Sequence, residues 1–235
     1  MSHRHSPGSL SLAIMVYGLS TVASADPQLP IPAVPPAPPG YLLVDEEMWS
    51  QLMDETGRHF DRARDAFLHG QTRTTALELR KAAIMMRIEA ANGRERADLA
   101  VLKSAHDLER LAHALLDGRS TDTIDDVDLA SSQALSALAH HDQVKAEAAW
   151  KMQRAHRSGH YLRVAADNLE RASFRARFEL TSATSSAIRN ARNLSRKLID
   201  GPDYALDEVG VGIDAVGHQI ERFQQSIVSL GTDRR

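Results

Sequence analysis

Apolar residues recur along much of the chain at alternating steps of four and three positions, the spacing of one buried face of an α-helix. The clearest series comprises Val101, Ala105, Leu108, Ala112 and Leu115. A more polar series with the same steps comprises Thr184, Ile188, Ala191, Ser195 and Leu198. A third comprises Trp49, Leu52, Thr56, His59, Ala63 and Ala66. These series predict amphipathic helices that pack together through one face.

The sequence repeats itself at a constant offset of 83 positions. Leu79-Arg80 recurs as Leu162-Arg163, and the aromatic Phe67 recurs as Trp150. A constant offset maintained over about 60 residues indicates one supersecondary unit used twice. The residues that repeat are leucines, alanines and one aromatic residue, so the repeated positions indicate a structural role. Most histidines do not repeat, so they are the candidate functional residues.

Turn and cap signals divide the pattern into five predicted helices. Gly70, Gly118 and Gly201 mark helix ends, and Thr123 with Asp126 resembles a capping box at a helix start. The predicted helices cover residues 45–69, 73–117, 123–155, 159–199 and 205–230, with Gly93 as a candidate break in the second. We therefore expect an all-α fold, an elongated antiparallel bundle built from two αα-hairpin repeats plus a fifth helix. Both hairpins are expected to turn at the same end.

Composition separates this helical part from the N-terminal part. Residues 1–25 combine Arg4, a short apolar run and the small residues Ala23-Ser24-Ala25, which predicts a cleavable signal peptide and export to the periplasm. Residues 26–40 hold seven of the nine prolines, which predicts an extended linker. Residues 41–235 contain one proline and are rich in helix formers, so they form the predicted helical repeat domain.

Charge and cysteine content narrow the range of possible functions. The formal net charge is −3, which gives no electrostatic basis for binding nucleic acid, and no segment of the mature chain is apolar enough to span a membrane. The chain has no cysteine, so disulfides and thiol catalysis are excluded. Nucleophile elbows, phosphate-binding loops and His-Glu-x-x-His motifs do not occur either. We expect no enzymatic activity and no obligatory cofactor.

Histidines near the two predicted hairpin turns form the first candidate site. His69 lies at the first turn, and His156 and His160 lie at the second. If the turns share one end of the bundle, these imidazoles could converge on Zn²⁺, Cu²⁺ or Ni²⁺. The alternative is that they are solvent-exposed turn residues.

A second candidate is a buried polar layer of His59, His141 and Asp142. His59 lies in an apolar series, and Asp142 occupies the equivalent place 83 positions later. Two packed copies could bring His59 to Asp142 as a charge-assisted pair that titrates near neutral pH. The alternative is a satisfied polar layer that sets helix register.

An interaction surface is the third candidate, because stacked helical hairpins present extended faces to partners. Its candidate residues are Trp49, Phe60 and Tyr161, while core packing is the favoured role for Phe67 and Trp150. The partner is expected to be a protein or a second copy of the chain. These features predict an exported, non-enzymatic interaction or stress-related binding module, with a metal-binding or pH-responsive protein as the alternative.

The segment Ala-Arg-Asp-Ala-Phe-Leu-His-Gly at positions 63–70 is similar to the first hairpin of the YfdX family. The later segment 184–213, with its spaced alanines, Leu-Ile-Asp and Asp-Glu-Val, is similar to the same family. The resemblance implies an exported, stress-associated helical protein. It implies no catalytic residues.

Overall fold

The chain forms two compact units in a computed structural model, Met1–Gln51 and Leu52–Arg235. The structure describes residues 13–16, 41–44, 46–91, 96–118, 123–201 and 204–232. Side chains are described from position 55 to position 227 within these ranges, except that of Arg96.

The first unit contains a pair of short parallel strands that the sequence pattern did not predict. Strand β1 (Ala13–Val16) pairs with β2 (Tyr41–Val44), with Ala13 opposite Tyr41 and Val16 opposite Val44. β1 lies within the predicted signal peptide, and β2 lies at the start of the predicted helical domain. Both are four-residue apolar runs, which are too short for hydrophobic periodicity to identify.

Seven helices are described where the sequence pattern predicts five, so the chain is mainly α-helical. They are α1 (Glu46–Leu68), α2 (Thr72–Ala90), α3 (Arg96–Leu116), α4 (Ile124–Lys151), α5 (Ala155–Arg175), α6 (Ser182–Asp200) and α7 (Leu206–Thr232). The predicted helix 73–117 is α2 and α3, separated around Gly93. The predicted helix 159–199 is α5 and α6.

No glycine or proline in the sequence marks the break between α5 and α6. Arg177 instead adopts a left-handed backbone with φ 52°, and the backbone N–H of Phe178 donates to the Ser173 carbonyl at 3.0 Å. Thr181 then caps α6, since its side-chain oxygen accepts from the Thr184 N–H at 3.1 Å. A non-glycine residue in the left-handed region is uncommon, which is why this helix end escapes prediction.

Gly159 is the opposite case, a glycine at the predicted start of the helix 159–199 that lies inside α5. A Cβ atom at this position would lie 2.9 Å from both the Leu198 Cβ and the Ser195 carbonyl oxygen on α6. Gly159 therefore permits close approach of α5 and α6 rather than a turn. The turn itself lies earlier, at Gln153, whose φ is 59°.

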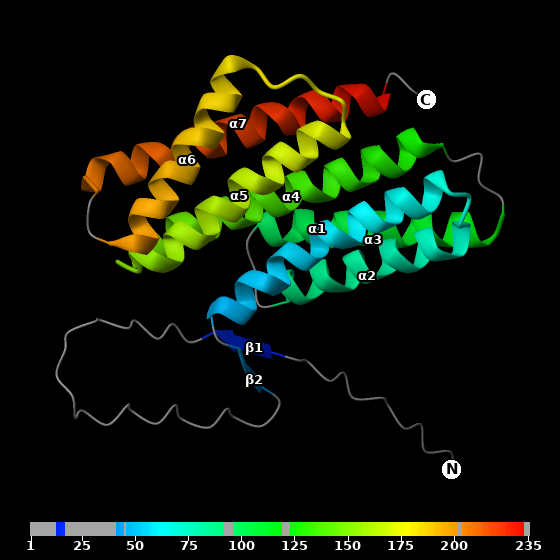
Figure 1. The fold of residues 1–235 in the computed structure, drawn as a ribbon, viewed down its shortest axis with the longest axis horizontal. Helices are drawn as coiled ribbons and strands as arrows, with labels where there is room; N and C mark the ends of the chain where they lie inside the picture. Colours follow the sequence, from blue (N-terminus) through cyan, green and yellow to red (C-terminus); the bar gives the residue numbers. More distant parts are fainter. Residues whose placement is uncertain are drawn as a thin grey trace, which may run out of the picture. The chain divides into compact units, whose positions relative to one another are not determined.

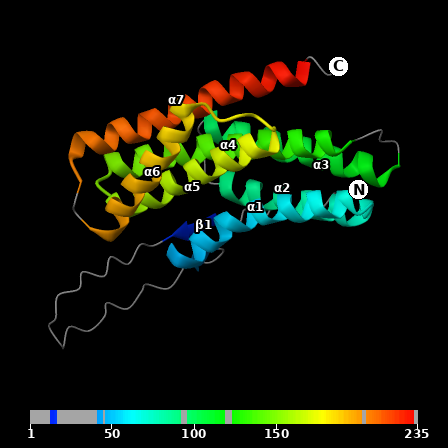
Figure 2. The same ribbon diagram turned by 45° about the horizontal axis from the view of Figure 1, so that its top comes forward.

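Equivalent turns follow α1 and α4 at the 83-residue offset. Gly70 (φ 70°) and Gln153 (φ 59°) occupy the same position, and each donates its N–H to the carbonyl of an aromatic residue, Phe67 or Trp150. Figures 1 and 2 show the α1–α2 turn and the α4–α5 turn at opposite ends of the helical unit. The expectation of a shared end is therefore wrong. Three helices separate the equivalent turns, so α4 begins its copy running opposite to α1.

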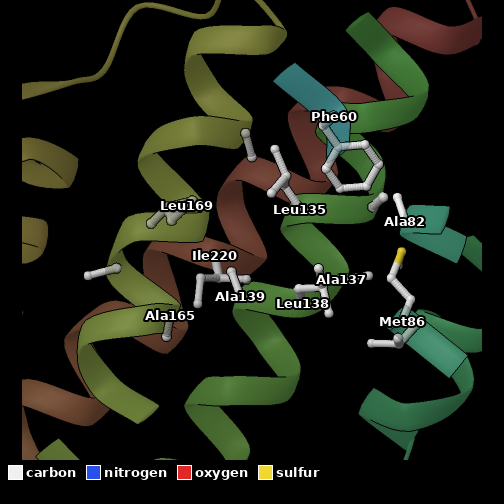
Figure 3. Packing of buried hydrophobic residues seen from close by; sticks show 14 of the residues in the cluster. Phe60, Ala82, Met86, Leu135, Ala137, Leu138, Ala139, Ala165, Leu169 and Ile220 are labelled. Atoms are coloured by element: carbon white, nitrogen blue, oxygen red, sulfur yellow. The ribbon is translucent and has the colours of Figure 1, made fainter. Parts of the chain in front are cut away.

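The core is built around α4. Six consecutive α4 residues from Ala134 to Ala139 are buried, so this part of the helix is enclosed on every side. Figure 3 shows Leu135 and Leu138 of α4 between Phe60 of α1, Met86 of α2 and the side chains of α5 and α7. Every described member of the three sequence series is buried, which confirms those series as packing faces.

The start of α4 follows the sequence signal. The Asp126 carboxylate accepts the Thr123 backbone N–H at 2.7 Å, which confirms the predicted cap. None of the helices in the described ranges combines the length and apolar character needed to cross a bilayer.

The Gly159 contact predicts a stability change of opposite sign at two helical glycines. Gly159→Ala is expected to destabilise the protein by about 1–3 kcal/mol, because the added methyl group overlaps Leu198 and the α6 backbone. At Gly210 in α7 an added Cβ meets no atom within 4 Å. Gly210→Ala should therefore be neutral or stabilising by up to about 1 kcal/mol. Urea denaturation of both variants measures the difference, and equal effects would contradict the assigned contact.

Candidate metal centre

A cluster of polar side chains lies beside the enclosed part of α4. His141 and Asp142 lie just after the buried segment, beyond half-buried His140, and are 2% and 0% exposed. At this depth the two polar groups cannot reach solvent by a change of rotamer. They must find partners inside the protein.

Glu89, in the last turn of α2, completes the cluster. One ligand atom each from Glu89, His141 and Asp142 lies within 4.8 Å of the other two. The Glu89 carboxyl group is buried, although the residue as a whole keeps partial exposure. Ligands bound about 2.0–2.2 Å from one ion lie about 3–4 Å apart. Small side-chain rotations therefore suffice to place these three atoms around a single ion.

Neighbouring side chains orient two of the three groups. The His141 Nδ1 lies 2.7 Å from Asp98 Oδ1, in the first turn of α3. The Asn168 side-chain amide on α5 donates to Asp142 Oδ2 at 3.1 Å. The Asp98 contact assigns the proton of a neutral imidazole to Nδ1 and directs the Nε2 lone pair away from Asp98.

Two acceptor atoms remain unsatisfied at the centre of the cluster. His141 Nε2 and Asp142 Oδ1 are buried and have no hydrogen-bond partner in the part of the chain that the structure describes. An unmet buried polar atom costs about 1–3 kcal/mol. Two acceptors cannot satisfy one another, whereas a cation or a proton satisfies both.

Burial raises the pKa of both carboxyl groups, Glu89 and Asp142, and repulsion from Glu89 raises that of Asp142 further. Burial raises the pKa of Glu89 to about 7, against the opposing attraction of Lys145. Burial and the Glu89 charge raise the pKa of Asp142 well above its ordinary value, although Lys145 and Asn168 oppose this. Burial and the Lys145 charge lower the pKa of His141 to about 4, against the pull of Asp98. At neutral pH His141 is therefore a neutral imidazole, the form that binds metals.

The donor set fits a divalent transition metal. One imidazole nitrogen and two carboxylates suit Zn²⁺, Mn²⁺ or Fe²⁺, and the hydrogen bond from His141 to a carboxylate is the usual support of a metal-bound histidine. A dication would neutralise the two buried carboxylates that otherwise repel each other. A shared proton is the alternative occupant, and it neutralises one of them.

Sequence reasoning identified His141 and Asp142 as buried but missed Glu89 and Asp98. Nothing adjacent to Glu89 or Asp98 in sequence distinguishes them from the many surface acids on the helices. They reach the cluster through the packing of α2 and α3 beside α4. The available signal was the run of small and apolar residues at positions 134–139, which predicts that the following turn of α4 is buried as well.

The expected pair between His59 and Asp142 is not formed. His59 is buried, but its Nδ1 lies 2.6 Å from Glu78 Oε2 on α2. Burial alone would raise the pKa of Glu78, but hydrogen bonds from Lys81 and His59 lower it. His59 and Asp142 each pair with the next helix along the chain, α2 and α5, so they belong to separate clusters instead of one layer.

The turn histidines do not converge either. His156 and His160 lie one turn apart on the continuous helix α5, with ring centroids 4.7 Å apart. His69 directly follows α1, and Figure 1 shows the end of α1 and the start of α5 at opposite ends of the helical unit. The His69 Nδ1 contacts the Asp65 carbonyl at 2.7 Å. In the described ranges, the residues within metal-binding distance are Glu89, His141 and Asp142. A three-histidine site is therefore wrong.

The predicted interaction residues are not a free surface. Phe60 is 0% exposed and belongs to the core, so its assignment to a surface is wrong. Tyr161 is half-buried against the core, and the side chain of Trp49 lies outside the described residues. Phe67 and Trp150 pack against the core as expected, and the Trp150 ring contacts Tyr204 edge-on at 5.8 Å.

A second group of charged residues, around buried Asp128, pairs its acids with arginines. Asp128 on α4 accepts from Arg64 Nε of α1 at 2.9 Å and lies 3.5 Å from Arg175 on α5, which also pairs with Asp61. Two hollows of about 270 and 320 Å³ adjoin this group, sharing Phe174 and Arg175. Together, the two linings contain four acids and four arginines. This group ties α1, α4 and α5 together and lacks the unmet acceptors of the metal centre.

No family model matches the chain, and no curated protein or solved structure does. The similarity to the YfdX family therefore stays a prediction.

The raised pKa of Glu89 predicts a pH dependence of stability in chelator-treated protein. A carboxyl group whose pKa is raised by folding stabilises the fold below its ordinary pKa, and this contribution is lost as pH rises toward 7. Relative to Glu89→Gln, the wild type should lose about 2–3 kcal/mol of unfolding free energy between pH 5 and pH 8. Urea denaturation at both pH values measures this. Glu221→Gln, at an exposed position on α7, is the control and should show no such difference.

Proposed function

We propose that the chain is an exported helical protein that binds one divalent transition-metal ion between α2 and α4. The observation that carries the proposal is the pair of buried, unsatisfied acceptors, His141 Nε2 and Asp142 Oδ1, in a cluster where one ligand atom each of Glu89, His141 and Asp142 lies within 4.8 Å of the other two. A dication satisfies both acceptors at once and offsets the charge repulsion between the two carboxylates.

Zn²⁺ is the best first probe because imidazole and carboxylate ligands both suit it and the site offers three of them. Mn²⁺ and Fe²⁺ suit the same donors, whereas the single buried imidazole disfavours Mg²⁺ and Ca²⁺. The near-complete burial of His141 and Asp142 leaves no access for an organic substrate. The ion therefore has a structural or sensing role, in agreement with the absence of catalytic motifs from the sequence.

Export is supported by the N-terminal sequence, and the similarity to exported YfdX proteins agrees with it. We also propose that the fold comprises two copies of a three-helix repeat, α1–α3 and α4–α6, followed by α7. The helix bounds support this, since each helix of the first copy overlaps its counterpart when moved by 83 positions. The metal ligands come from both copies, so the ion would join them. A protein partner or self-association stays a sequence-based prediction.

Calorimetric titration of chelator-treated protein with Zn²⁺ tests the site. We expect one ion per chain and a rise in unfolding free energy of about 2.7 kcal/mol when free Zn²⁺ is 100 times the Kd. Asp142→Asn removes one ligand charge but keeps the volume of the side chain. It should remove Zn²⁺ binding while leaving the metal-free protein at least as stable, because an unsatisfied carboxylate is lost.

Asp214→Asn is the matched control, since Asp214 is exposed on α7. It should bind Zn²⁺ with wild-type affinity. Absence of saturable binding to the wild type, or equal binding to the Asp142→Asn variant, would overturn the proposed function.

Asp98 supplies a separate prediction as the positioning partner of His141. Asp98→Ala should weaken Zn²⁺ binding by about 10- to 100-fold, because the Nδ1–H tautomer and the ring orientation are no longer held. Asp98→Asn keeps a carbonyl acceptor and should recover part of the affinity. Long-range ¹H–¹⁵N spectra of His141 report the tautomer, and an unchanged tautomer in Asp98→Ala would contradict this role.

A further inference from the structure

Phe174, near the end of α5, is the most exposed large apolar side chain in the described ranges. It is 77% exposed, whereas every other phenylalanine, tyrosine or tryptophan side chain that the structure describes is buried or half-buried. A single exposed apolar residue is common on protein surfaces. Phe174 differs from such a residue because it lines both of the hollows near Asp128.

The first of these hollows, of about 270 Å³, reaches the core. Its lining includes Phe60 of α1 and Leu135 of α4, which are 0% and 1% exposed and lie side by side in Figure 3. The hollow therefore has apolar residues beneath it and room for a phenyl ring. A projecting aromatic ring and an apolar recess thus adjoin each other on one surface.

A glycine on α1 keeps this hollow open. Gly57 has no side chain to fill the recess, and a Cβ atom at this position would overlap the Arg171 guanidinium group. Glycine is a poor helix former, and Gly57 lies inside α1. The close approach of Arg171 gives a reason for glycine at this place, and the recess is its consequence.

The charges around the two hollows are balanced in sign. The first hollow has Asp61 on its lining and the second has Arg177, with side chains that are 65% and 64% exposed. Each has a partner within the chain, Arg175 or Asp125, and still presents most of its side chain to solvent. A ligand with one charge gains no net attraction from four acids and four arginines. A surface with both signs is complementary to itself when a two-fold rotation lays one end over the other.

We propose that the Phe174 surface, formed by Phe174 and the two hollows, joins two copies of the chain about a two-fold axis. Each Phe174 ring occupies the 270 Å³ hollow of the other copy, and the Arg177 end of one surface lies over the Asp61 end of the other. The surface itself supplies the projecting ring, the recess and the opposite charges. Exposed aromatic and arginine side chains are also the residues that interfaces favour. The inference does not depend on the proposed metal function.

Sedimentation velocity of the full-length chain in excess chelator tests the association. We expect a monomer–dimer equilibrium with a micromolar Kd, because each copy contributes one main apolar contact. Phe174→Ser should weaken the dimer at least about tenfold. Leu206→Ser is the matched control, since Leu206 is 74% exposed on α7, and should leave the Kd unchanged.

A mixing experiment tests the two-fold exchange of rings. Gly57→Leu displaces the flexible Arg171 guanidinium and fills the recess but keeps Phe174, whereas Phe174→Ser keeps the recess. Dimers of either variant alone lack both ring contacts, and a mixed dimer retains one. The mixture should therefore associate at least about tenfold more tightly than either variant alone. Equal association of the mixture and the separate variants would overturn the two-fold arrangement.

A spectroscopic readout follows position 174 itself. The Phe174→Trp variant keeps an aromatic ring, and its emission, less that of the wild type, should shift to shorter wavelength as the protein concentration rises. Emission that does not depend on concentration contradicts the proposal. So does a wild type that is monomeric at about 100 µM, which leaves the hollow to a different protein, or an equal Kd for Phe174→Ser and Leu206→Ser. If Gly57→Leu does not fold, the serine variants and the tryptophan emission decide the question.

Discussion

The enclosure of the central part of α4, from Ala134 to Ala139, is the constraint on which the rest of the structure depends. A helix with one buried face can turn any polar residue toward water, but a fully covered helix has no such freedom. Two of its buried serines accordingly bond to backbone, since Ser131 donates to the Val127 carbonyl and Ser132 donates to the Ala172 carbonyl, each at 2.7 Å. His141 and Asp142 are subject to the same requirement, and protein groups meet only part of it. The candidate metal centre lies where the protein provides too few hydrogen-bond donors for its buried acceptors.

The packing faces were predictable from sequence, and the number of helices was not. Series such as Val101 to Leu115 depend on local periodicity, which one chain segment contains in full. The end of α5 depends on Arg177 adopting a left-handed backbone, a choice that tertiary contacts stabilise against local preference. The helix start predicted at residue 159 is wrong for a related reason, since the role of Gly159 is defined by α6 and not by its neighbours in sequence.

The candidate metal centre was likewise only partly predictable from sequence. His141 and Asp142 were identifiable because they follow a run of small residues on one helix. Glu89 and Asp98 come from the facing ends of α2 and α3, and no spacing rule within a single segment connects them to α4. The repeat helped only by contrast, since it showed where the second copy departs from the first. At one such place the first copy pairs His59 with Glu78 through a contact of 2.6 Å, and the second has two buried acceptors without a partner among the described residues.

The strand pair in the first unit joins a segment predicted to be removed with one predicted to remain. Cleavage after residue 25 would take β1 away and leave the Tyr-Leu-Leu-Val backbone of β2 with an open hydrogen-bonding edge. An open apolar edge pairs readily with another extended segment. Maturation of the chain would then do more than release it from the export machinery. It would also expose the backbone N–H and C=O groups of β2 that pair with β1.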